Sequence, residues 1–191
     1  MAAIIAADQG DDAAAQEIAQ RGWERAQQLN QMLLCAWALN ALGYAAMQRG
    51  DLGGALAWYE QYVPLVHDTE NGAARLLILG CAAEAFFRAG RIDDALRLVE
   101  QAITIAEFAK APHRLALARR VQSQILVAQG KFDGALRAFD DAIATFSQLG
   151  SQLELARAIY HRAALRVGRG DAKDNEAARA EVGRARDSFA E

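Results

Sequence analysis

The sequence of 191 residues is poor in the residue types that interrupt helices, cross-link small folds or bind metals. It has two prolines, two cysteines and three histidines. Cys35 and Cys81 each stand alone in an apolar, alanine-rich stretch, so we interpret both as small buried hydrophobic residues. No apolar run approaches the ~18 residues of a membrane-spanning helix, and the N-terminus lacks the positive start of a signal peptide. A soluble, cytoplasmic segment is therefore expected.

The chain also lacks an excess of positive charge. It has 21 basic and 24 acidic residues, a net charge of -3, and the two signs are mixed along the sequence. This distribution offers no extended positive surface to a phosphate backbone, which argues against DNA or RNA as a partner of this segment. Alternating β-branched residues are almost absent, while 53% of the residues are hydrophobic. The composition therefore favours helices around a sizeable core.

A glycine in similar surroundings recurs at a constant interval, at Gly10, Gly50, Gly90, Gly130 and Gly170. A fixed period of this length indicates a repeat architecture. Apolar residues recur at helical spacing on both sides of each glycine. Glycine adopts the left-handed conformation at a helix C-terminus without a steric penalty, so each one is expected to lie in the turn between two antiparallel helices.

The repeat predicts a single domain over residues 1–191. We expect a half repeat at 1–31, followed by four repeats at 32–71, 72–111, 112–150 and 151–191. The expected helices are 11–29, 32–49, 53–68, 73–89, 93–110, 112–129, 133–148, 152–169 and 174–190. Residues 1–8 form only a stub of a first helix. This would leave Ile18, Trp23 and Ala26 without part of their cover.

Three local features give further expectations. Asp93 and Asp133 each follow an apolar residue and are predicted to cap the N-termini of their helices. Pro64 removes an amide donor inside a helical stretch, so a kink or an early helix end is expected near residues 60–63. Residues 171–175 add about three polar residues to the period, which predicts a longer turn.

Aligned on the glycine, the copies resemble the tetratricopeptide repeat. The small residues and rings of that motif match Gly43, Gly50, Asp51, Ala55 and Tyr59, then Ala83, Phe86, Gly90, Ala95 and Ala102, then Ser123, Gly130, Ala135, Phe139 and Ala142. The resemblance covers nearly the whole chain. It implies an all-α fold: a right-handed superhelical solenoid of antiparallel helix hairpins, with about nine helices. Small residues are needed where the helices of a hairpin cross closely.

The period of this chain is longer than the ~34 residues of the standard motif. This long form, with segments such as 39–43, 50–60 and 146–158, resembles the C-terminal repeat arrays of large bacterial signalling proteins. These are the ATP-dependent LuxR-type transcription activators and the nucleotide cyclases coupled to an ATPase module. The resemblance implies the regulatory segment of a larger protein of that kind. Nothing of their catalytic or DNA-binding modules is present in this sequence.

The tetratricopeptide resemblance also implies a concave face formed by the first helix of each repeat. Carried over position by position, this face contains Trp37, Asn40, Tyr44, Met47, Gln48, Glu84, Phe87, Arg88, Arg120, Gln124, Arg157, Tyr160 and His161. Aromatic rings, amides and arginines together suit an extended peptide or an acidic segment. The alternative is that Trp37, Tyr44 and Phe87 only pack between repeats. Asn40 and Tyr44 stand where a clamp for a C-terminal carboxylate would need Lys and Asn, which disfavours recognition of a chaperone C-terminus.

No catalytic constellation, phosphate-binding loop or set of metal ligands can be assigned, so neither enzymatic activity nor a cofactor is expected. The preferred function is a protein-interaction or ligand-sensing scaffold that binds a peptide, a partner domain or a small effector. The alternative is an assembly module that associates through the ends of its solenoid, for instance as a homodimer through the incomplete N-terminal end.

Overall fold

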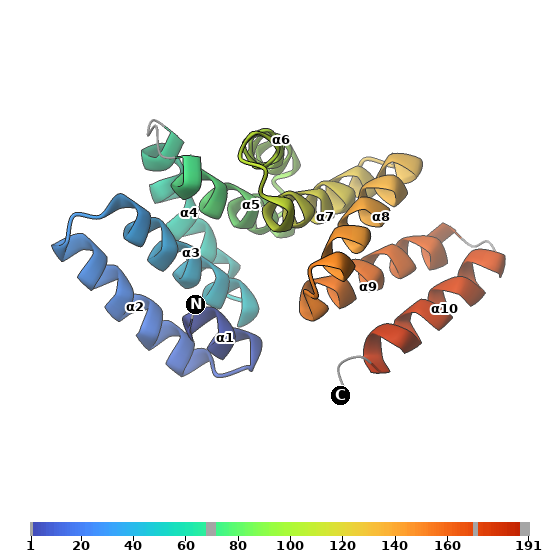
Figure 1. Cartoon of the computed structure of the whole chain (residues 1–191), viewed down its shortest axis with the longest axis horizontal. Coiled ribbons are helices and arrows are strands. Elements are labelled where there is room, and N and C mark those ends of the chain that lie inside the picture. Colours follow the sequence, from blue (N-terminus) through green and yellow to red (C-terminus); the bar gives the residue numbers. More distant parts are fainter. Residues whose placement is uncertain (1, 68–71, 170–171, 188–191) are drawn as a thin grey trace. The chain divides into compact units, whose positions relative to one another are not determined.

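A computed structural model describes residues 2–67, 72–169 and 172–187, which form ten helices and no strand (Figure 1). The helices are α1 (Ala2–Asp8), α2 (Asp12–Gln28), α3 (Met32–Gln48), α4 (Leu52–His67), α5 (Gly72–Arg88), α6 (Ile92–Phe108), α7 (Pro112–Ala128), α8 (Phe132–Gln148), α9 (Gln152–Arg169) and α10 (Ala172–Asp187). The expected helices are confirmed. The tenth is α1, which the sequence analysis treated as a stub.

Helix starts recur at a constant interval of half a repeat, from α2 at Asp12 through α3 at Met32 to α10 at Ala172. The predicted glycine turns are confirmed at Gly10, Gly50, Gly90 and Gly130, where φ lies between 71° and 80°. Gly170 lies outside the described residues. Three connections between repeats use the same left-handed geometry, with Asn30 at φ 49°, Lys110 at φ 50° and Gly150 at φ 66°, and the fourth, at residues 68–71, lies outside the described residues. One turn geometry therefore joins helices both within and between repeats.

The hydrogen bonds of these turns close the helix ends in the same way. At the first full turn, the Gly50 amide donates to Met47 O (3.1 Å) and the Asp51 amide donates to Ala46 O (2.9 Å). Equivalent pairs of bonds occur around Gly90, Gly130 and Gly150. Two carbonyls left free at each helix end are satisfied in this arrangement, which requires the left-handed residue between the two amides.

The predicted aspartate caps are placed wrongly in the sequence analysis. α6 begins at Ile92 and α8 at Phe132, so Asp93 and Asp133 already lie inside the first turn. The residues before these helices, Arg91 and Lys131, make no side-chain cap bond. Aspartate does cap two other helices, where Asp11 Oδ1 accepts from the Ala14 amide (3.1 Å) and Asp51 Oδ1 accepts from the Gly54 amide (2.8 Å). The carboxylates in the first turns of α6 and α8 are instead stabilised by the positive end of the helix dipole.

Two irregularities were expected, one near Pro64 and one near residues 171–175. α4 continues through Pro64 to His67, so the early helix end near residues 60–63 is wrong, while the alternative of a kink there stays a prediction. α10 begins at Ala172, which places residues 172–175 in the helix rather than in a longer turn. Residues 170–171 lie outside the described part of the chain. The half-repeat interval between helix starts is kept at both positions.

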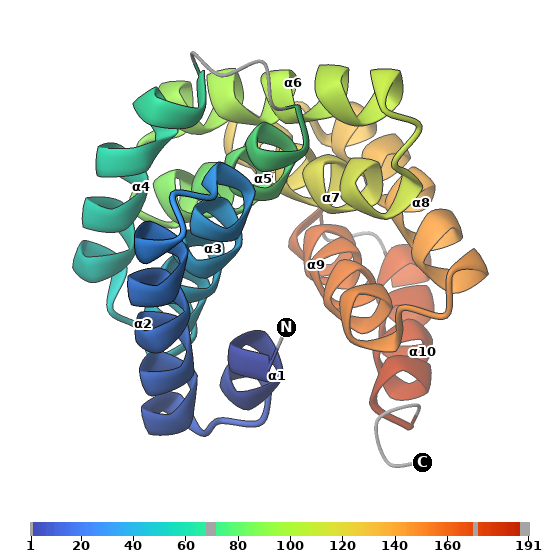
Figure 2. The same ribbon diagram turned by 60° about the vertical axis from the view of Figure 1, so that its left-hand side comes forward.

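Contacts divide the chain into two compact units, residues 1–109 and 110–191. The first unit contains the hairpins α1–α2, α3–α4 and α5–α6, and its first helices α1, α3 and α5 also contact one another in succession. Trp23 of α2 packs edge-on against Trp58 and Tyr62 of α4, with ring centroids 6.4 and 5.0 Å apart. Figure 2 shows α1 beside α2 and α3. The single domain over residues 1–191 stays a prediction.

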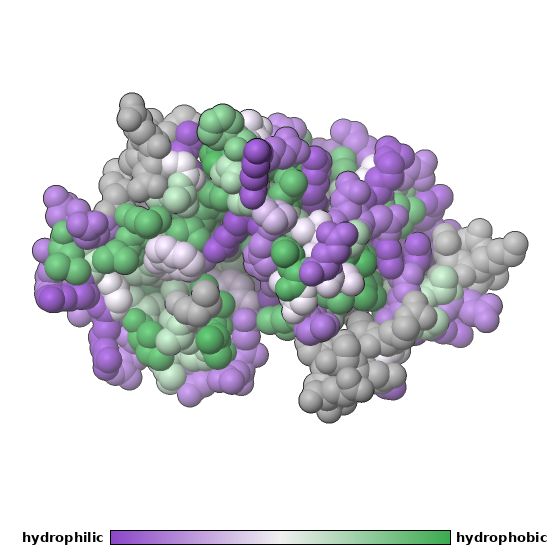
Figure 3. Space-filling view, viewed as in Figure 1, coloured by the Kyte–Doolittle hydropathy of each residue, from purple (hydrophilic) through white to green (hydrophobic). Residues whose placement is uncertain are grey.

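The N-terminal end is better covered than the sequence analysis expected. α1 is a helix of seven residues whose Ala3 joins the core cluster around Trp23. Trp23 and Ala26 are buried as a result, so the expectation of missing cover is wrong for both. Ile18 is 38% exposed and Ile5 is 50% exposed. Hydrophobic residues accordingly reach the surface around α1 and α2 (Figure 3).

The second unit contains the hairpins α7–α8 and α9–α10. α9 packs onto α7 and α8, where Ala158 joins Phe146 in one apolar cluster and Leu165 joins Phe139 in another. Charged residues add to these contacts: Glu181 of α10 pairs with Arg162 (3.1 Å) and also with Arg166 of α9. Arg162 pairs in addition with Asp140 of α8, so the acidic pair at residues 140–141 serves a contact between helices.

Candidate binding surfaces on the first helices

In the first unit, eight of the predicted site residues lie on α3 and α5, the first helices of two neighbouring hairpins. Asn40, Met47 and Glu84 are buried. Arg88 is exposed, while the remaining four, Trp37, Tyr44, Gln48 and Phe87, are half-buried. The exposed and half-buried residues therefore form the accessible part of the predicted set in this unit, and the three buried residues support it from beneath.

Polar contacts hold this part of the first unit. The Tyr44 hydroxyl donates to the Asp8 carboxylate of α1, and Arg88 pairs with Glu84 at 2.6 Å, one turn away on α5. Beneath them, the Tyr59 hydroxyl is buried. Burial raises its pKa well above the ordinary value, and the nearby Cys81 and Glu84 raise it further. Tyr59 therefore stays neutral and acts as a packing residue.

In the second unit, α7 and α9 bring two predicted arginines together around one carboxylate. Arg120 is buried, and its Nε lies 3.1 Å from Glu154 Oε2. The other oxygen of Glu154 lies 2.7 Å from Arg157 Nη1. Two guanidinium groups therefore contact the same carboxylate. Arg157 keeps about a quarter of its side chain exposed and is the accessible member.

Glu154 is the residue of this candidate site that the sequence analysis did not include. It lies in the first turn of α9, three residues before Arg157. That spacing on a helix was visible in the sequence, and it predicts an ion pair. The contact with Arg120 was not visible, because it joins residues 34 positions apart on different helices.

The remaining predicted residues of the second unit are Gln124, Tyr160 and His161. Gln124 and His161 are half-buried, whereas Tyr160 is 60% exposed. The rings of Tyr160 and His161 stand edge to face with centroids 5.5 Å apart. Nearby, burial lowers the pKa of His113, and Arg114 lowers it further, while Glu154 acts in the opposite direction. The second unit therefore presents a guanidinium and an aromatic pair on α9.

The accessible groups of these surfaces can form ion pairs and apolar contacts. Guanidinium groups donate to carboxylates in a fixed planar geometry, and exposed rings provide flat apolar contact. Within residues 2–67, 72–169 and 172–187, no three metal-binding side chains gather in one group. The helices described here also include none that is long and apolar enough to span a membrane.

Comparison with known proteins supports the repeat architecture. Residues 74–148 match the family described as "Tetratricopeptide repeat". Repeats of this family are typically non-catalytic scaffolds that bind protein partners. The search of curated proteins found no match.

A solved structure shows the same fold. The crystal structure of BtubC (BKLC) from P. vanneervenii superposes with a TM-score of 0.71 at 18% sequence identity, covering 90% of this chain and 72% of that one. At this identity the likeness concerns the fold alone. Residues 74–148 therefore match tetratricopeptide repeats, within a chain whose fold is that of a tetratricopeptide-like helical solenoid.

Proposed function

We propose that this chain is a protein-interaction scaffold whose first helices bind an extended, acidic segment of a partner protein. The observation that carries the proposal is the trio of Arg120, Glu154 and Arg157. This trio places the guanidinium group of Arg157 at a partly exposed position on α9. An acidic side chain of a partner can form a charge-assisted hydrogen bond with an accessible guanidinium group of this kind. Arg88 offers a second exposed guanidinium on α5 of the first unit.

The aromatic residues support an extended partner rather than a single charged group. Phe87 is half-buried next to Arg88, and Tyr160 is exposed three residues after Arg157. Each unit therefore places a flat apolar surface close to a guanidinium along one helix. A partner segment that alternates acidic and apolar residues would engage both.

A selection from a phage-displayed library of short random peptides tests the proposal, because it requires no known partner. We expect the protein to enrich peptides that contain Asp or Glu together with a large apolar residue. The dissociation constant of the best peptide is then measured by fluorescence anisotropy. Because each unit carries its own guanidinium group and ring, either Arg88→Gln or Arg157→Gln should raise this constant about fivefold, as expected for one partly exposed ion pair.

The matched control removes the same charge elsewhere. Arg21 on α2 and Arg97 on α6 are exposed arginines of second helices. The single variants Arg21→Gln and Arg97→Gln should each bind the peptide with the affinity of the unchanged protein. Equal losses in the test and control variants would show that only net charge matters, and enrichment of peptides without acids would contradict the proposal.

We further infer that the scaffold is the cytoplasmic regulatory segment of a larger bacterial signalling protein. The inference is supported by the sequence resemblance of residues 39–43, 50–60 and 146–158 to repeat arrays of that kind. An antibody against this chain, applied to an extract of the source cells, should detect a protein several times heavier than 20.7 kDa. A single band at 20.7 kDa would contradict this inference. A small effector that bound this surface in place of a peptide would raise the melting temperature and displace the selected peptide.

A further inference from the structure

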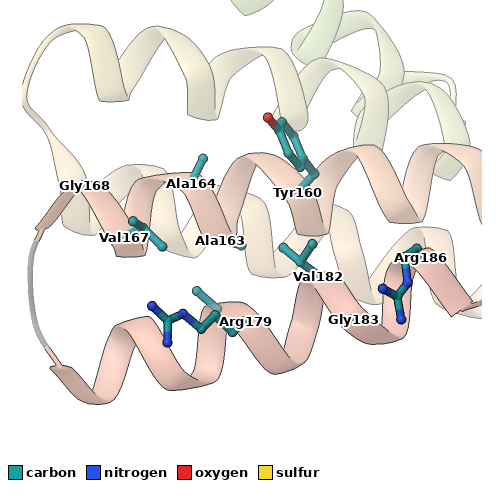
Figure 4. Close-up of a pocket in the computed structure, with 10 residues that line it drawn as sticks. Tyr160, Ala163, Ala164, Val167, Gly168, Arg179, Val182, Gly183 and Arg186 are labelled. Carbon is teal, nitrogen blue, oxygen red and sulfur yellow. The ribbon is translucent and has the colours of Figure 1, made fainter.

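An apolar groove lies between α9 and α10 on the face of the last hairpin, with a volume of about 590 Å³ (Figure 4). Tyr160, Ala164 and Val167 line it from α9, and Val182 lines it from α10. Val167 is 52% exposed and Val182 is 38% exposed. Two arginines of α10, Arg179 and Arg186, border the same groove and are exposed. Because they are seven residues apart, they lie two turns apart on one side of the helix.

The repeat shows what occupies the equivalent groove one hairpin earlier. One full repeat before Val182, Arg179 and Arg186 stand Ala142, Phe139 and Phe146. All three are buried, and α9 covers them. Leu165 of α9 packs against Phe139, while Ala158 of α9 packs against Phe146. The groove between α7 and α8 is thus occupied by α9, which runs antiparallel to α8.

The α9–α10 groove differs in chemistry from the earlier one. Its floor is apolar at Ala164, Val167 and Val182, where the preceding repeat has Gln124, Val127 and Ala142. Both buried phenylalanines are replaced by arginines at the rim. An occupant that carried apolar residues opposite the two arginines, as α9 does opposite the phenylalanines, would bury two guanidinium groups against methyl groups. Carboxylates at those two positions would pair with them instead.

We propose that the α9–α10 groove binds an acidic amphipathic helix of a partner protein. The apolar side chains of this helix contact Val167 and Val182. Two of its carboxylates, spaced seven residues apart, pair with Arg179 and Arg186. This site differs from the surface of the proposed function, with which it shares only Tyr160. Helix recognition in an apolar groove uses anchors on one face at spacings of three and four residues.

The probe is a synthetic peptide that copies the length and spacing of α9. On a neutral background of Ala and Gln, it carries Leu at the positions of Leu155 and Arg162, and Glu at the positions of Ala158 and Leu165. These four positions share one face of a helix. The control peptide has Lys in place of both Glu. We expect the protein to bind the Glu peptide about tenfold more tightly than the Lys peptide, with a smaller ratio at high salt.

The variant Arg179→Glu/Arg186→Glu should invert this preference, so that the Lys peptide binds more tightly than the Glu peptide. Both arginines are exposed, and the circular dichroism spectrum should remain unchanged. Equal affinities for the two peptides, or a preference that the variant does not invert, would overturn the proposal. Self-association of the protein that the variant abolishes would also overturn it, because the occupant would then be a second copy. The peptide selected for the first helices should bind this variant normally, which separates the two sites.

Discussion

Gly43 and the ring of Tyr59 make one of the closest approaches between helices in the first unit. A methyl group on Gly43 would lie 2.4 Å from Tyr59 Cζ, and Tyr59 is buried with little room to move. Gly43→Ala should therefore destabilise the protein by roughly 1–3 kcal/mol through overpacking, measured by urea unfolding.

Gly80 provides the control for this change, because it is also helical and a methyl group there meets nothing within 4 Å. Gly80→Ala should raise stability by about 0.5–1 kcal/mol, since alanine has the higher helix propensity. Equal effects of the two substitutions would show that Tyr59 does not restrict position 43.

His113 should make stability depend on pH. Burial lowers the pKa of this half-buried side chain below its unfolded value of about 6.5. The unfolded chain then binds the proton more readily, so the contribution to stability is present above pH 6.5 and is lost as the pH falls through the folded pKa. Urea unfolding at pH 7.5 and pH 5.0 should show a smaller loss on acidification for His113→Phe than for the unchanged protein. An identical loss in both proteins would contradict the assignment.

The individual residues show where sequence reasoning succeeds and where it stops. The small residue at position 43 and the ring at position 59 were predicted from the motif, because crossing helices constrain side-chain size. The burial of Arg120 was not predicted, since a guanidinium is usually exposed and its partner Glu154 lies on another helix. Whether the predicted concave set binds a partner stays a prediction.

At the scale of the element, the ion pair between Arg120 and Glu154 joins α7 to α9. Only 4% of the Arg120 side chain is exposed. Arg120→Glu would place two carboxylates side by side, so we expect a loss of about 3–5 kcal/mol in urea unfolding. The swapped pair Arg120→Glu/Glu154→Arg should recover part of it. Arg97→Glu, which breaks an exposed pair with Asp94, should cost about 1 kcal/mol or less. A similar cost at both positions would show that Arg120 is not held in a buried pair.

The turns offer a second prediction at this scale. Lys110 adopts a left-handed conformation that disfavours every residue with a side chain. Lys110→Gly should therefore stabilise the protein by about 0.5–1 kcal/mol, and Gly90→Ala should destabilise it by about 1–2 kcal/mol. Thermal unfolding provides the measurement. We expect the two variants to change the melting temperature in opposite directions. A loss of stability in both would contradict a left-handed turn geometry shared by Lys110 and Gly90.

The predicted elements agree with the structure where glycine marks the turn. Helix ends near Gly50, Gly90 and Gly130 were predicted because glycine tolerates the conformation that the turn requires. Asn30 and Lys110 adopt the same conformation without glycine. Asparagine is a residue type that tolerates this conformation, whereas nothing in the sequence predicted it for Lys110. The starts of α6 and α8 were placed one residue late, because an apolar residue followed by Asp also resembles a capped start.

At the scale of the whole molecule, the described core clusters each lie within one of the two units. In repeat proteins, stability arises from contacts between neighbouring repeats, so a local change acts mainly on the repeats close to it. Gly43→Ala should therefore increase hydrogen exchange in peptides of residues 1–109 and leave peptides of residues 110–191 close to their original rates. Mass spectrometry of the exchanging peptides provides the measurement. A uniform increase over both units would instead favour the single cooperative domain predicted from the sequence.

The constant interval between helix starts has a consequence for how such a chain changes length by gene duplication. Duplicating a single helix with its turn would preserve every turn but would exchange the roles of all later helices, so that residues suited to the first helix of a hairpin would occupy the second. Duplicating a whole hairpin with both turns, for example residues 112–151, preserves both the turns and the roles. The shortest segment whose duplication is tolerated is therefore a hairpin with both turns, which is twice the single helix and turn that repeats in the backbone.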